Sequence, residues 1–111
     1  MKYACLVYLD EKLPEAVPDR ECKAFGDELR ARGQFLGGEA LQPSHTATVV
    51  RIRNGATTLT DGPFAETKEQ LAGFYLIDAA DLNEAVRIAS HIPPARVGTI
   101  EVRPVRELDV R

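Results

Sequence analysis

Two segments of the chain are apolar at nearly every position. The first runs from Tyr3 to Leu9 and the second from Leu71 to Ile77. Neighbouring side chains of a strand point to opposite faces, so each segment forms a strand that is apolar on both faces. Strands of this kind are covered on both sides, and we therefore expect both to be central strands of a sheet.

Apolar residues at helical spacing predict two helices. The first covers Pro18 to Arg32 and stops at Gly33, which is typical of a helix C-terminus. The second begins at Asp81, which forms a capping box with Glu84, and ends at Pro93. Their apolar stripes are Cys22, Phe25, Gly26 and Leu29 in the first helix, and Leu82, Ala85, Ile88, Ala89 and Ile92 in the second.

The remaining β-rich segments complete the pattern. Residues 34–41 and 98–105 each predict one strand, and the Gly37-Gly38 pair indicates a bulge or a close backbone approach. Residues 46–53 and 56–60 flank Asn54-Gly55, a strong hairpin signal. Without this hairpin the order is βαββαβ, the ferredoxin-like arrangement, which places the first and third strands centrally. We expect one α+β domain over residues 1–111, ferredoxin-like with an inserted β-hairpin.

Two helices cover only one face of such a sheet. The other face would leave an apolar patch in water. A second copy of the chain, packed sheet against sheet about a two-fold axis, covers it most economically. The pattern therefore predicts a homodimer with a cavity between the sheets.

Composition narrows the class of protein. Of the 111 residues 44% are hydrophobic and 28% charged, as in folded domains. Lys and Arg number 14 against 17 Asp and Glu, so the basic excess of a nucleic-acid-binding domain is missing.

No apolar run approaches the roughly 20 residues of a membrane span. We see no signal peptide, and with only two cysteines, Cys5 and Cys22, we expect a cytoplasmic protein without disulfides.

Residues 61–69 carry the densest candidate chemistry. Asp61 precedes Gly62-Pro63, a turn that would fix where its carboxylate points. Held near the Lys68 cation, Asp61 would stay ionised and act as a general base or ligand anchor, with Glu66 assisting. The alternative is an Asx-turn at Asp61, solvated charges at Glu66 and Lys68, and Phe64 as a core anchor.

The run Asp-Gly-Pro-Phe-Ala-Glu-Thr-Lys-Glu at 61–69 resembles the signature of the YCII-related, DGPF-type family, and the similarity extends over nearly the whole chain. The resemblance implies a dimeric α/β barrel. It also implies kinship with cofactor-free enzymes, in one branch of which a His-Asp pair is proposed as catalytic. Members of the DGPF branch often lie beside extracytoplasmic-function sigma factors. The resemblance supplies no settled reaction.

Four further residues are candidates for ligand binding: His45, Arg51, Arg53 and Phe64. His45 lies in the loop before the hairpin and could reach the inter-sheet cavity as a partner of Asp61, or be a plain surface histidine. Arg51 and Arg53 share one face of the hairpin and could hold a carboxylate or phosphate, or form ordinary charge pairs. The other histidine, His91, is explained by its place at a helix C-terminus.

Three functions remain open. The first is a cofactor-independent isomerase or lyase acting on a small polar or aromatic molecule, with Asp61, Glu66 and Lys68 as catalytic residues. The second is a non-catalytic small-molecule-binding or regulatory protein, for example one that serves a sigma-factor system. In the third, the role of the signature at residues 61–69 is purely structural, and these residues shape the dimer. The chain has no phosphate loop, Cys-x-x-Cys pair, His-x-x-x-His or Gly-x-Ser-x-Gly motif, so we expect no cofactor and no metal.

Overall fold

A computed structural model of the protein describes residues 1–13 and 17–110. Its main sheet is antiparallel and has the strand order β2, β5, β1, β6. The strands are β1 (Lys2–Leu9), β2 (Phe35–Ala40), β5 (Gln70–Asp78) and β6 (Thr99–Pro104). The two strands that the sequence predicts to be central, β1 and β5, are central. With the helices between them, this is the ferredoxin-like α+β fold.

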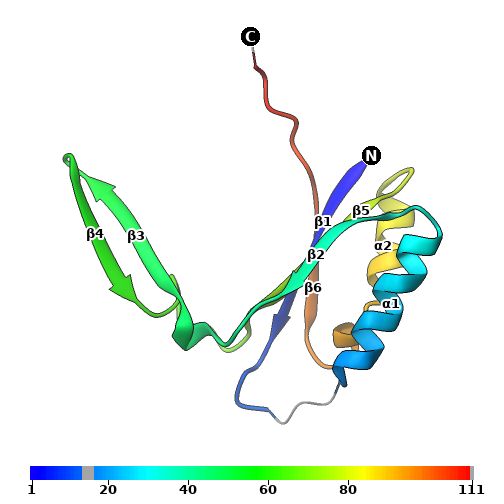
Figure 1. The fold of residues 1–111 in the computed structure, drawn as a ribbon, viewed down its shortest axis with the longest axis horizontal. Helices are drawn as coiled ribbons and strands as arrows, with labels where there is room; N and C mark the ends of the chain where they lie inside the picture. Colours follow the sequence, from blue (N-terminus) through cyan, green and yellow to red (C-terminus); the bar gives the residue numbers. More distant parts are fainter. Residues whose placement is uncertain (14–16, 111) are drawn as a thin grey trace.

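Both helices, α1 (Asp19–Ala31) and α2 (Leu82–Ala89), cover the same face of this sheet (Figure 1). A short 3₁₀ helix, η2 (Pro93–Arg96), leads into β6. No helix in the described part of the chain is long and apolar enough to cross a membrane. The core lies between the sheet and the two helices, and its buried residues are Tyr3, Cys5, Val7, Phe25, Leu29, Ile77, Ala79, Ala85, Ile88, Ala89 and Ile92.

The helix ends match the predicted signals with three corrections. Gly33 has a φ of 72° directly after α1, as its role as a stop requires. The Asp81 carboxylate accepts from the Glu84 amide at 2.9 Å, but the Glu84 carboxylate accepts from Ala80, so only half of the capping box forms. The second helix ends at Ala89, before the proline pair. Leu82 is 51% exposed, because the stripe that packs on the sheet begins one turn later, at Ala85.

The predicted bulge and close approach in β2 are both present. The register with β5 shifts between Phe35 and Gly37. A Cβ on Gly38 would lie 2.8 Å from the Phe74 carbonyl oxygen, and a Cβ on Gly73 would lie 2.8 Å from that of Glu39. Glycine at both positions therefore lets β2 and β5 approach closely.

The other face of the sheet is open. Tyr3, Cys5 and Val7 face the helices, so alternation places Leu6 on the opposite face, where it pairs with Phe74. Leu76 lies on the same face, and all three side chains are only half-buried. Within the described residues no helix covers this face (Figure 1). We call it the open sheet face.

The inserted hairpin forms a separate two-stranded sheet of β3 (Thr48–Arg53) and β4 (Ala56–Asp61). Asn54 and Gly55 have φ values of 52° and 76°, as a type I′ turn requires. A 3₁₀ turn, η1 (Ser44–Thr46), precedes it, so β3 begins two residues later than predicted. The hairpin extends away from the main sheet (Figure 1), and we call it the arm.

Candidate functional site

A cleft of about 1300 Å³ opens between α1, the adjoining ends of β2 and β5, and the segment that follows β1. Most of its wall is apolar. Gly26 of α1 and Gly38 and Gly73 of the sheet line it, and the lack of a side chain at Gly26 leaves space there. The apolar character is that of a small-molecule site, and the space exceeds the roughly 300–1,000 Å³ usual for such sites. Its apolar and aromatic lining includes Val7, Leu9, Leu13, Val17, Phe35, Leu41 and Tyr75.

One wall joins Cys22 of α1 to Tyr75 of β5. The Cys22 thiol and the Tyr75 hydroxyl lie close enough for each to affect the pKa of the other. Burial raises the pKa of Tyr75 to about 12, and burial together with nearby Asp19 raises the pKa of the Cys22 thiol. A thiol with a raised pKa is a weak nucleophile, so Cys22 contributes a part of the cleft wall.

Aromatic rings stiffen the same wall. Tyr75 packs edge-on against Phe25 at 5.5 Å and against Phe35 at 6.5 Å between ring centroids. The Arg30 guanidinium lies 4.4 Å from the centroid of the Phe35 ring. These contacts fix the side chains of the wall in the absence of a ligand.

The other end of the cleft is polar and joins the segment after β1 to η1. The Glu11 carboxylate accepts hydrogen bonds from the Ser44 hydroxyl and, at 2.7 Å, from the Ser44 amide. These bonds, with the nearby His45 ring as a further contribution, lower the pKa of Glu11. His45, a predicted ligand-binding residue, lines the cleft beside this pair.

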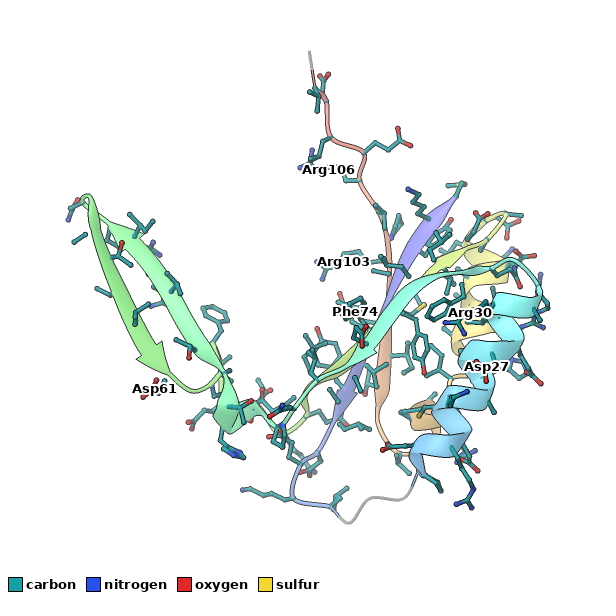
Figure 2. The ribbon with its side chains drawn as sticks, viewed as in Figure 1. Asp27, Arg30, Asp61, Phe74, Arg103 and Arg106 are labelled. Atoms are coloured by element: carbon teal, nitrogen blue, oxygen red, sulfur yellow. The ribbon has the colours of Figure 1, made fainter. Side chains whose placement is uncertain are left out.

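The charged lining is negative overall. Its two permanent cations, Lys23 and Arg30, both pair with Asp27, at 2.9 Å and 3.1 Å. Figure 2 shows Asp27 and Arg30 together on α1. Four further carboxylates line the cleft without a cation within ion-pair distance in the described structure, so the cleft favours neutral or cationic groups. They are Asp10, Glu11, Asp19 and Glu39.

The structure brings together two predicted ligand-binding residues, Arg51 of the arm and Phe64 of the segment that follows it. The Arg51 guanidinium lies 5.5 Å from the centroid of the Phe64 ring. Phe64 is 79% exposed, so the alternative that it anchors the core is wrong. Arg53 shares the face of Arg51, as predicted, and its guanidinium donates to the Ile52 carbonyl at 3.0 Å.

The three predicted catalytic residues lie apart from the cleft. Asp61 ends β4 at the base of the arm (Figure 2), while Glu66 and Lys68 lie in the loop that leads to β5. All three are exposed, and within the described residues none of them forms an ion pair with another. In a single chain Asp61, Glu66 and Lys68 therefore do not form a joint site.

A polar cluster at the border of the open sheet face was missed by sequence reasoning. The Tyr8 hydroxyl donates to Glu101 at 3.4 Å, and Arg103 donates two hydrogen bonds to the other carboxylate oxygen of Glu101. The alternation of Glu101 and Arg103 marked one strand face, but Tyr8 lies 93 positions from Glu101 and gives no local signal. In the described structure no three His, Cys, Asp or Glu side chains gather as metal ligands.

Comparison with known proteins fits this fold. The family model of the YCII-related domain matches residues 1–109. An uncharacterised protein of Rhizobium meliloti (strain 1021) is 40% identical over 114 aligned positions, which cover 95% of this chain and 92% of the relative. The chain therefore belongs to the YCII-related family.

Proposed function

We propose that the protein binds a small, largely apolar molecule in the cleft between α1 and the sheet. The observation that carries this proposal is the lining, in which glycines, aliphatic side chains and aromatic rings form a largely apolar wall with a small number of polar groups. Binding sites for small organic molecules combine such an apolar wall with a few polar groups that fix orientation. Glu11 and His45 are the polar groups we assign to orientation.

The charge of the lining selects the ligand class. Carboxylates outnumber cations, and both permanent cations are already paired with Asp27. A ligand with an anionic end would meet net repulsion, whereas an amine or a neutral hydrogen-bond donor would be attracted. We therefore propose an aromatic or aliphatic body with an amino or other donor group.

A paired thermal-shift experiment tests the proposal. Phenethylamine and 3-phenylpropionate have similar bodies and opposite charges. We expect amines of this type to raise Tm by roughly 5 °C at ten times Kd, and matched carboxylates to have little effect. Gly26→Leu would fill the cleft and abolish the shift, while Ala24→Leu, at an exposed position of α1, would keep it. Equal shifts for Gly26→Leu and wild type would place binding elsewhere.

The proposed working unit is a homodimer joined through the open sheet face. The half-buried apolar side chains of Leu6, Phe74 and Leu76 support it, because a patch of this kind is normally covered. Light scattering should give 24.4 kDa, twice the 12.2 kDa of one chain. Leu76→Asp should return the mass to that of one chain, and a wild-type mass of one chain would refute the dimer.

Acid–base catalysis without a cofactor is the second candidate. Asp61 would act as base or ligand anchor, assisted by Glu66 and Lys68, with Arg51, Arg53 and Phe64 contacting the substrate. Because these side chains are exposed in one chain, a second copy would have to complete the site. Turnover of a stabilising ligand that is lost in Asp61→Asn would support this candidate. Unchanged binding without turnover would favour a regulatory role, such as service to a sigma-factor system.

We also place the protein in the reducing cytoplasm. Cys5 and Cys22 are free thiols, and Cys5 is fully buried. Free thiols are typical of proteins in reducing compartments. Fractionation of the native host would test this placement.

A further inference from the structure

The arm makes the chain less compact than a domain of its length. The radius of gyration is 15.9 Å, against about 13 Å for a compact domain of 111 residues. The excess comes with two parts that extend away from the main sheet, the arm and the C-terminal segment after β6 (Figure 1). An isolated two-stranded hairpin is at best marginally stable in water. The arm therefore needs a covering surface that one chain does not supply.

The two faces of the arm differ in chemistry. The register places Val50 opposite Leu59, with Ile52 on the same face, and the side chains of these residues are 60%, 69% and 64% exposed. Arg51 and Arg53 lie on the other face. The arm thus has one apolar face and one basic face, and an exposed apolar face of this kind marks an interaction site.

Charge complementarity points to a second copy of the chain as the covering partner. Residues 48–61 carry Arg51, Arg53 and Asp61, a net charge of +1. The whole chain carries −3, so the remainder of each chain carries −4. The opposite net charges favour contact between the arm of one copy and the body of another. The arm also extends on the side of the sheet opposite the helices (Figure 1), where a copy packed on the open sheet face would lie. A symmetric pair satisfies both arms at once.

We propose that the arm is a clasp between subunits, which lies against a second copy and buries its apolar face there. This inference rests on the homodimer of the proposed function. Asp61 pairs with Thr48 and therefore lies on the apolar face of the arm. Its carboxylate enters the contact between the copies, and a site containing Asp61 is built from two chains.

Two neighbouring substitutions test the clasp. Leu59→Asp places a charge on the apolar face, and Thr58→Asp places the same charge on the other face. We expect Leu59→Asp to raise the dimer dissociation constant roughly a hundredfold or more, because both arms carry the charge, and Thr58→Asp to change it by less than about tenfold. Neither position belongs to the core among the described residues, so both variants should keep the far-UV spectrum of the wild type. Sedimentation equilibrium measures the constants.

The possible failures are distinguishable. If Leu59→Asp dimerises as tightly as wild type, or if Thr58→Asp dissociates equally, the clasp is overturned and the homodimer stands. If wild type has the mass of one chain, both are overturned. In a further test, a photoreactive amino acid is placed at position 59 in a mixture of unlabelled (light) and isotope-labelled (heavy) chains. It should cross-link light chains to heavy chains. The same amino acid at position 58 should give no such cross-links. Cross-links confined to one chain would also overturn the clasp.

Discussion

The Gly62 amide donates a hydrogen bond of 2.7 Å to the Ala47 carbonyl, and this contact closes the arm at its base. Gly62 has a φ of 101°, a conformation that side chains resist. We therefore expect Gly62→Ala to loosen the base of the arm, at a cost of about 1–2 kcal/mol in local stability. Hydrogen exchange should show faster exchange of the arm amides with unchanged exchange in β1 and β5.

Gly37→Ala provides the control for this prediction. A Cβ at Gly37 meets nothing within 4 Å, and its φ is not in the left-handed region. This variant should leave the arm amides as protected as in wild type. Equal protection in Gly62→Ala would show that the Gly62 conformation does not hold the arm.

Gly26→Ala should stabilise the protein by about 0.5–1 kcal/mol, because alanine favours the helix interior over glycine. A Cβ there lies 3.9 Å from the Phe35 ring, an ordinary van der Waals contact. Gly38→Ala should destabilise, since its Cβ would lie 2.8 Å from a backbone oxygen. Urea unfolding measures both, and a loss of stability in Gly26→Ala would contradict the packing described for this wall.

Stability should fall at alkaline pH. Burial raises the pKa of Cys5 from 9.0 to about 11 and that of Tyr75 from 10.0 to about 12. The unfolded chain then loses these protons first, so the contribution of each group is complete below its unfolded pKa and is lost as pH rises through its folded pKa. Urea unfolding from pH 8 to pH 12 should show this decline in the free energy of unfolding. Tyr75→Phe should remove the part of the decline that occurs at the highest pH. A flat profile would contradict it.

Ser44→Ala should raise the pKa of Glu11 toward its ordinary value, because the Ser44 hydroxyl is the largest cause of its lowering. An NMR titration of the Glu11 side chain measures the change. Thr46→Ala, whose hydroxyl bonds the Pro43 carbonyl, is the control and should leave Glu11 unchanged. No movement in Ser44→Ala would argue against the hydrogen bonds at this end of the cleft.

Much of the fold was predictable because its signals are local. Apolar positions on both faces identified β1 and β5 as central, Asn54-Gly55 gave the hairpin turn, and Gly33 gave the end of α1. The prediction that Leu82 packs on the sheet was wrong, because helical spacing alone does not show at which turn a helix first contacts its sheet.

The cleft could not be predicted because distant segments build it. Cys22 and Tyr75 meet only when α1 packs on β5, and Glu11 meets Ser44 across 33 positions. The signal present in the sequence was the set of glycines in α1, β2 and β5, of which only the pair Gly37-Gly38 had indicated a bulge or a close backbone approach. The signature at 61–69 pointed to Asp61, Glu66 and Lys68, which are exposed in a single chain.

Protection of Cys22 from alkylation tests the binding cleft most directly. Cys22 lines the cleft and Cys5 is fully buried, so alkylation of the folded protein reports on Cys22. At pH 8.5, an amine that raises Tm should slow the reaction roughly tenfold or more, because bound ligands fill most of such a site. The matched carboxylate should leave the rate unchanged. An unchanged rate with an amine that raises Tm would contradict binding in this cleft.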